Sequence, residues 1–292
     1  RRRERRLTGP LVPSLDPYAT EQTHCSLYCC YRQNIRFIKG LRGKADHVPA
    51  AWTILMNCGV ILVVMRNVQE GSRGFEVAYL QRLLNLRSGA ALREDGLFGP
   101  RTRRALEAWQ SSTGRPRTGS AGQAEFQQLG MQTCIEHPVV VGGQPTSTSC
   151  WSAAMTMMRG SNRSIGPGAA SLGALGGLQS SRQNVETFAR QNGLRVLSSM
   201  TSYGVPQLCG WLSRGPVLAI GAGHIGPRAF SHACVLSGII SDHNPNGSGT
   251  VIRIHDPEPV GIGSIGWAWF GGATQWTPVA SYELFGAYLI GA

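Results

Sequence analysis

Three kinds of signal are missing from this sequence. Cys134, Cys150, Cys209 and Cys234 have no neighbours at the Cys-x2-Cys or His-x3-His spacings of zinc sites, so we expect neither a metal nor a cofactor. No helix pattern typical of DNA reading and no aromatic RNA platform is present, which argues against a nucleic-acid partner. The apolar run 50–65 is too short to span a bilayer, so we expect no membrane span.

Acidic residues are also scarce. The chain has 16 Asp and Glu but 28 Lys and Arg, and the resulting net charge of +12 is distributed unevenly along the sequence. Residues 1–64 carry +6, residues 65–131 carry +4 and residues 132–292 carry only +2. Basic surfaces attract anionic polymers through long-range electrostatics. The middle segment is therefore suited to an anionic polymer of the cell envelope.

The first 64 residues show no sustained hydrophobic period and hold four of the eight cysteines. The run 50–65 is apolar enough for the core of a signal peptide, but no small-x-small cleavage site follows it. We expect residues 1–64 to be a disordered or non-native extension, with a natural start at Met65. A secretion segment is the main alternative, and a folded element is the third.

The most informative stretch begins at Gln144 and reads Gln-Pro-Thr-Ser-Thr-Ser-Cys, and Trp151 follows Cys150 at once. The pattern predicts a thiol at the start of a helix, where the partial positive charge of the helix end favours a thiolate. A thiolate is the nucleophile of cysteine enzymes, and a nearby amide is able to donate a hydrogen bond to an oxyanion. Cys150 is therefore a candidate nucleophile and Gln144 a candidate oxyanion donor, although a core cysteine and a loop amide are the ordinary interpretations.

A thiol nucleophile also needs a base and a group that orients the base. His232 lies in a strand-like run of small and apolar residues that ends at a glycine turn signal, Gly238. Asp256 ends the alternating run 251–256 just before a proline. A carboxylate on the next strand is able to accept a hydrogen bond from the His232 ring and fix its tautomer. His232 and Asp256 are thus the candidate base and orienting group.

Taken together, these segments resemble the papain-like cysteine peptidases, especially their bacterial secreted and effector-type members. The resemblance rests on the Gln-x5-Cys-Trp-Ser-Ala-Ala segment and on the chain order Cys150, His232, Asp256. It implies an α+β fold with a papain-like catalytic domain over 134–292. In that domain Cys150 would attack a peptide carbonyl, His232 would pair with the thiolate, and Gln144 would stabilise the oxyanion together with a backbone N–H.

Other residues compete for the same roles. Asp242 is the rival of Asp256, but it lies in a predicted hairpin turn. His255 adjoins Asp256 and would point to the opposite face of a regular strand. We interpret the remaining histidines as ordinary surface or turn residues: His24, His47, His137, His224 and His243.

Residues 66–131 have a different pattern, with apolar residues at helical intervals from Val77 onwards. A tight turn follows at 94–100, and helices are predicted over 102–110 and 121–129. The sequence Asp-Gly-x-Phe-Gly-x-x-Thr-x-x-Ala resembles the small three-helix peptidoglycan-binding domain of bacterial cell-wall hydrolases. Most of the matching residues make the turn or fill the small core, so the rim of the second helix is our hypothesis for the wall-binding surface.

Further elements are expected in the last segment. The sequence predicts helices over 183–191 and 206–213, and strands over 215–221, 232–240 and 250–256. One of the two neighbouring tryptophans, Trp267 or Trp269, is a candidate for the wall of a cleft.

These features lead to one main interpretation of function. The chain is expected to be a cysteine peptidase, secreted or located in the periplasm or cell envelope, and targeted to the bacterial cell wall by a peptidoglycan-binding domain. Its partners would be peptidoglycan and a peptide or protein substrate. Two alternatives stay open: a peptidoglycan amidase or endopeptidase acting as a lysin or antibacterial effector, and a non-enzymatic wall-binding protein.

Overall fold

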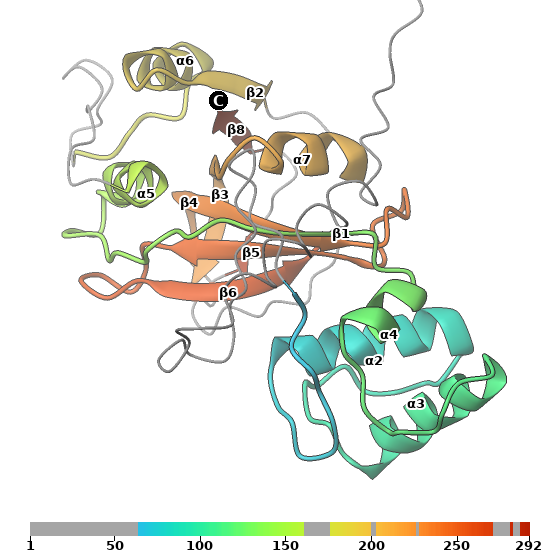
Figure 1. Ribbon diagram of the computed structural model, residues 1–292. Helices are drawn as coiled ribbons and strands as arrows, with labels where there is room; N and C mark the ends of the chain where they lie inside the picture. The colour runs from blue at the N-terminus through green and yellow to red at the C-terminus, as the bar shows by residue number, and fades with distance from the viewer. Residues whose placement is uncertain (1–63, 161–175, 200–202, 226–227, 271–280, 283–286) are drawn as a thin grey trace, which may run out of the picture. The chain divides into compact units, whose positions relative to one another are not determined.

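The computed structural model describes most of the chain after residue 63 (Figure 1). The described ranges are 64–160, 176–199, 203–225, 228–270, 281–282 and 287–292. The expectations for residues 1–64 fall outside these ranges, apart from Val64.

The first described helices are α2 (Phe75–Ser88), α3 (Pro100–Ser112) and α4 (Gln123–Gln128). α2 ends where Gly89 adopts a left-handed φ of 63°, a conformation that glycine accepts without a Cβ clash. Pro100 opens α3, where its missing N–H removes no intrahelical bond. The third helix is shorter than predicted because Ala121 is extended and exchanges two backbone hydrogen bonds of 2.9 Å with Val68.

The apolar positions of these helices form one core cluster. Members on α2 and α3 are fully buried, as the helical spacing predicts: Val77, Leu80, Leu83, Leu84 and Leu106. Trp269 belongs to the same cluster and is 4% exposed, while the ring of Trp267 stacks on Phe75 with a centroid distance of 3.9 Å. Trp269 therefore packs in this core and the partly buried Trp267 packs against it, and the cleft role of either residue stays a prediction.

The last segment contains three more described helices: α5 (Cys150–Arg159), α6 (Arg182–Gln191) and α7 (Val205–Leu212). The predicted helices at 183–191 and 206–213 are confirmed to within one residue at each end. α5 stops at Gly160, which takes a left-handed φ of 62° and donates its N–H back to the helix.

An antiparallel sheet completes the fold within the described residues. Its strands are β1 (Thr133–Glu136), β2 (Arg195–Ser199), β3 (Val217–Ile225), β4 (Arg228–Ser241), β5 (Thr250–Asp256), β6 (Ser264–Trp269), β7 (Ser281–Tyr282) and β8 (Tyr288–Gly291). The order across the sheet is β2-β8-β3-β4-β5-β6, with β1 paired to β4 and β7 paired to β3.

Alternation along the central strands β3 and β4 sends side chains into two separate cores. Leu218 and Val235 pack with α5 and α6, whereas Val217 and Leu236 pack with α7. Figure 1 shows α7 lying along the sheet and α5 close to β4. The chain thus places a helical segment before a segment that mixes helices with an antiparallel sheet, in line with the expected α+β class.

Candidate active site

Cys150 is the first residue of α5, as the sequence predicted, and it is 9% exposed. The turn before it is closed by Ser149, whose hydroxyl accepts from the N–H of Thr146 at 2.9 Å, while its N–H donates to the Thr146 carbonyl at 3.2 Å. This local closure ends the preceding loop and starts the helix at the cysteine. The helix is held by its apolar face, where Ala154 and Met155 are fully buried.

His232 lies on β4, opposite Gly221 of β3, and its side chain is 2% exposed. Its Nε2 lies 2.6 Å from Oδ1 of Asp256, the last residue of β5. A carboxylate only accepts hydrogen bonds, so Nε2 carries the proton that points at Asp256. The imidazole is also hydrogen bonded to the Cys150 side chain, which leaves Nδ1 as the nitrogen that faces the thiol.

The proton affinity of His232 follows from these contacts. Burial by itself would lower the pKa of the imidazole, because it penalises the charged form. The hydrogen bonds to Asp256 and Cys150, and the charges of those two groups, outweigh burial and raise the pKa from 6.5 to about 9. The site therefore stabilises a protonated imidazole beside the thiol at neutral pH.

Asp256 is fully buried and serves two donors. Its Oδ1 accepts from Nε2 of His232 and, at 2.9 Å, from the backbone N–H of Glu258. The carboxylate is thus held by the turn that follows its own strand. Its orientation is fixed before any substrate arrives.

Gln144 is also fully buried, in the loop that leads to α5. Its backbone N–H donates to the Pro257 carbonyl at 2.9 Å, and its carbonyl accepts from Gly261 at 2.9 Å. Its Nε2 donates to the carboxylate of Glu258. The structure therefore ties Gln144 to the turn after Asp256, which is a link that the sequence did not predict.

The competing residues lie in other environments. Asp242 pairs with Arg87 at 3.1 Å and accepts from the N–H of Asn244 at 3.0 Å, as expected of a turn residue. His137 is buried and its Nε2 lies 2.6 Å from the Leu212 carbonyl.

Two further histidines are also accounted for. His255 is fully buried, and burial together with nearby Arg253 lowers its pKa to about 4. His243 takes a positive φ of 58° in the turn after β4. His24 and His47 lie outside the described residues, as does the side chain of His224.

The other cysteines of the described residues have free thiols in apolar surroundings. Burial raises the pKa of Cys134 to about 12 and that of Cys209 to about 11. Burial also raises the pKa of Cys234 well above its ordinary value. These thiols stay protonated at neutral pH, which suits them to packing and not to nucleophilic attack. In the part of the chain that the structure describes, no group of three His, Cys, Asp or Glu side chains is arranged to hold a metal ion.

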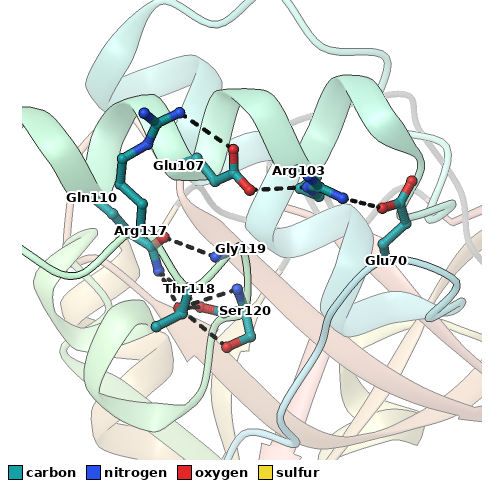
Figure 2. A network of polar contacts seen from close by, with 8 residues as sticks. All are labelled: Glu70, Arg103, Glu107, Gln110, Arg117, Thr118, Gly119 and Ser120. Atoms are coloured by element: carbon teal, nitrogen blue, oxygen red, sulfur yellow. Dashed lines mark hydrogen bonds and ion pairs between the residues drawn. The ribbon is translucent and has the colours of Figure 1, made fainter.

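The turn of the helical segment is held by buried amides. Gln81 donates to Asp95 and Thr102 at 3.1 Å and accepts from the N–H of Gly96 at 3.0 Å. Figure 2 shows how Gln110 holds the loop after α3: its Nε2 donates to Thr118, and its Oε1 accepts from Gly119. These motif residues are structural, as the sequence indicated.

The second helix of this segment borders a hollow of about 530 Å³. The hollow lies between α3 and the loop that follows α2, and its lining includes the exposed Arg101 and Arg104 and the buried Trp109. Arg103, on the same helix, is instead bonded to Glu70 and Glu107 (Figure 2). The rim predicted from the sequence therefore contains two arginines that line an open surface. No helix of the described residues combines the length and apolar character that crossing a bilayer requires.

Two families of known proteins match parts of this chain. Residues 131–274 match the family described as papain-like cysteine protease AvrRpt2, and residues 73–129 match the peptidoglycan binding domain family. Both predicted resemblances, and their order along the chain, are thus confirmed. The two matches indicate cysteine peptidase activity and association with the cell wall.

One similar solved structure is entitled "The crystal structure of SleB N-terminal domain". It is 34% identical over 22% of this chain and 88% of that chain, with a TM-score of 0.21. The search of curated proteins found no match.

Proposed function

We propose that this chain is a papain-like cysteine peptidase whose active site consists of Cys150, His232, Asp256 and Gln144. The observation that carries the proposal is one buried chain of contacts, from the Cys150 thiol through the His232 ring to the Asp256 carboxylate. A thiol next to a base that is itself oriented by a carboxylate is the arrangement that nucleophilic catalysis requires. The family match over 131–274 supports the same reaction class.

The first half of the reaction forms an acyl-enzyme. The Cys150 thiolate adds to the carbonyl carbon of the scissile amide, and the carbonyl oxygen becomes an oxyanion. When this intermediate collapses, Nδ1 of His232 gives its proton to the leaving nitrogen as the C–N bond breaks. The amine departs, and a thioester to Cys150 and a neutral imidazole remain.

Water completes the turnover. Neutral His232 takes a proton from water, whose oxygen attacks the thioester carbon. The C–S bond breaks, the acid product leaves, and Cys150 returns to a thiolate paired with protonated His232. The raised pKa of His232 suits this cycle, because the imidazole keeps at neutral pH the proton that it gives to the leaving nitrogen.

Two other groups prepare the site. Asp256 holds the imidazole in the tautomer that presents Nδ1 to the thiol. Gln144 supplies a side-chain N–H to the oxyanion, together with the backbone N–H of Cys150 at the start of α5. Neither role requires a metal or cofactor.

The helical segment, 66–131, would bring this activity to the cell wall. Its family match is to a peptidoglycan-binding domain, and its net charge of +4 suits anionic envelope polymers. We propose that the protein acts outside the cytoplasm, in the cell envelope or as a secreted enzyme. This match also favours the second candidate function, in which the same residues cleave peptidoglycan stem peptides or the amide that joins them to sugar.

A product assay tests the proposal and separates its alternatives. Purified protein is incubated with casein and, separately, with isolated sacculi, and new amines are counted in each. Amines released from casein support a protein substrate, and amines released only from sacculi support the peptidoglycan hydrolase. Release must vanish in Cys150→Ala and persist in Cys209→Ala, a matched change of a buried thiol. Full release by Cys150→Ala would refute the mechanism, and binding without release by the wild type would favour the non-enzymatic alternative.

A further inference from the structure

Gln144 is fixed at the backbone by the turn that follows β5. Two hydrogen bonds of 2.9 Å, one from Gln144 to Pro257 and one from Gly261 to Gln144, clamp the residue on both sides. Close packing reinforces the clamp, since a Cβ added at Gly143 would lie 2.1 Å from the backbone nitrogen of Ile262. The main chain of Gln144 therefore has little freedom, and the orientation of its side-chain amide depends on what the amide contacts.

The side-chain amide of Gln144 carries an NH2 group and an oxygen, and the group that faces the substrate decides whether the amide is able to stabilise an oxyanion. An N–H stabilises an oxyanion, whereas the amide oxygen would repel it. Nε2 of Gln144 donates to the carboxylate of Glu258, which is only able to accept. Glu258 therefore selects the amide orientation, engages one N–H and leaves the second N–H of the same nitrogen free to donate. Oε1 of Gln144 is buried and has no hydrogen-bond partner among the described residues, so it does not oppose this choice.

Glu258 is itself held through both its backbone N–H and its backbone carbonyl. Its N–H donates to Oδ1 of Asp256 at 2.9 Å, and its carbonyl accepts from the hydroxyl of Ser264 at 2.8 Å. Asp256 Oδ1 is also the atom that accepts from His232. One short turn thus holds the carboxylate that orients the base and the carboxylate that faces the oxyanion donor.

We propose that Glu258 is a positioning residue for the peptidase reaction, which fixes the Gln144 amide with its nitrogen available to the oxyanion. This inference rests on the proposed function of Cys150 and Gln144 and adds a residue that acts through Gln144. Glu258 does not touch the substrate in this scheme. Its removal should therefore affect the step that forms the oxyanion and not the binding of substrate.

The test uses the full-length protein and the variants Glu258→Ala, Glu258→Gln, Gln144→Ala and the double variant Glu258→Ala/Gln144→Ala. kcat and KM are measured on a peptide substrate that the wild type cleaves. The rate at which iodoacetamide alkylates Cys150 is measured in parallel. Alkylation needs the thiolate but forms no oxyanion, so it reports the Cys150–His232 pair alone.

The expected result separates positioning from structure. Glu258→Ala lowers kcat by roughly 10- to 100-fold, less than the roughly 100- to 1,000-fold for complete loss of an oxyanion donor because Gln144 is still present, with KM and the alkylation rate unchanged. Glu258→Gln keeps most of the activity, because its amide oxygen is still able to accept from Gln144. In the Gln144→Ala background, Glu258→Ala has no further effect.

Other outcomes would overturn the inference. A matching fall in alkylation would mean that Glu258 acts through Asp256 and His232. An effect that persists without Gln144, or one that appears in KM, would mean that Glu258 acts on the substrate or the fold. Full activity of Gln144→Ala with an inactive Cys150→Ala would remove the role of Glu258 and leave the peptidase intact. Full activity of Cys150→Ala would instead refute the proposed function itself.

Discussion

Nε2 of His232 lies 2.6 Å from Oδ1 of Asp256, although 23 residues separate them in the sequence and they come from two different strands. Both side chains are almost fully buried, so water does not compete for the hydrogen bond. The strand register explains the meeting, because β4 and β5 pair Val235 with His255 and thereby bring Asp256 diagonally opposite His232. Four predictions follow from this pair and from the helical segment.

Replacing the carboxylate at position 256 should impair catalysis. Asp256→Asn is expected to lower kcat by roughly 10- to 100-fold, because the amide oxygen is still able to accept from Nε2 but the negative charge that favours the protonated imidazole is lost. Steady-state turnover of a peptide substrate measures the effect.

Asp242→Asn is the matched control, since Asp242 is also a buried carboxylate. It should keep kcat within about twofold but lose about 1–3 kcal/mol of unfolding free energy, because its partner Arg87 loses an ionic contact. A large loss of kcat in Asp242→Asn alone would reverse our assignment of the two carboxylates.

The pH dependence should follow His232. Its pKa in the folded protein is about 9, above the ordinary 6.5, so the native state binds this proton more tightly than the unfolded chain does. The contribution of His232 to stability is therefore fully present below about pH 6.5 and is lost as the pH rises through 9.

The pH dependence of activity should also report the titration of His232. The value of kcat/KM should fall along an alkaline limb near pH 9, where His232 loses the proton that the leaving nitrogen needs, and the rate of Cys150 alkylation should change over the same range. Asp256→Asn should move this limb to lower pH. Chemical denaturation at several pH values and a pH–rate profile provide the two measurements. An alkaline limb that stays in place in Asp256→Asn would contradict our account of the raised pKa.

Gln81 should be important for the stability of the helical segment. The residue is 2% exposed, and its amide bonds Asp95, Leu97, Thr102 and the N–H of Gly96. Gln81→Ala leaves several buried polar groups without a partner and should lower the unfolding free energy by about 2–4 kcal/mol. Gln127→Ala, at an exposed position of α4, should change it by less than about 0.5 kcal/mol. Urea denaturation of both variants measures the difference, and equal effects would disprove the structural role of Gln81.

The arginines that line the hollow beside α3 should contribute to wall binding. Arg101→Ala/Arg104→Ala is expected to weaken binding to isolated sacculi by roughly 3- to 10-fold at low salt, and by less at high salt, where exposed charges are screened. Cleavage of a soluble peptide should not change. Arg103→Ala is the control on the same helix, because Arg103 is bonded to Glu70 and Glu107. Co-sedimentation with sacculi measures binding, and equal losses in both variants would place the binding surface elsewhere.

Local sequence patterns predicted the presence of helices and strands better than the residues at which they begin and end. The helix that starts at Cys150 and the helices α6 and α7 agree with the sequence, because apolar spacing and glycine or proline signals act over one or two turns. β3 and β4 are longer than predicted. Beyond the apolar run, Gly223 pairs with Phe230 and Ile225 with Arg228 through backbone hydrogen bonds, which need no apolar side chains.

The sequence predicts the residues of the candidate site and the contacts of His232 with Cys150 and Asp256, but not the link between Gln144 and Glu258. Cys150, His232, Asp256 and Gln144 were all selected from local sequence and family resemblance, and the contacts among the first three agree with that choice. Glu258 was missed. The signal available was a carboxylate two residues after Asp256 between two prolines, which by itself describes an ordinary polar turn.

The sequence alone determined where the nucleophile candidate begins a helix, which residue types are at hand for its chemistry, and that a helical wall-binding-like segment comes first. These properties depend on neighbours along the chain, so they are readable without a structure. Only the tertiary structure decided which histidine meets which carboxylate and which side chain holds the Gln144 amide. Those contacts join residues that are 24 and 114 positions apart, and strand register and loop packing, which no local pattern specifies, bring them together.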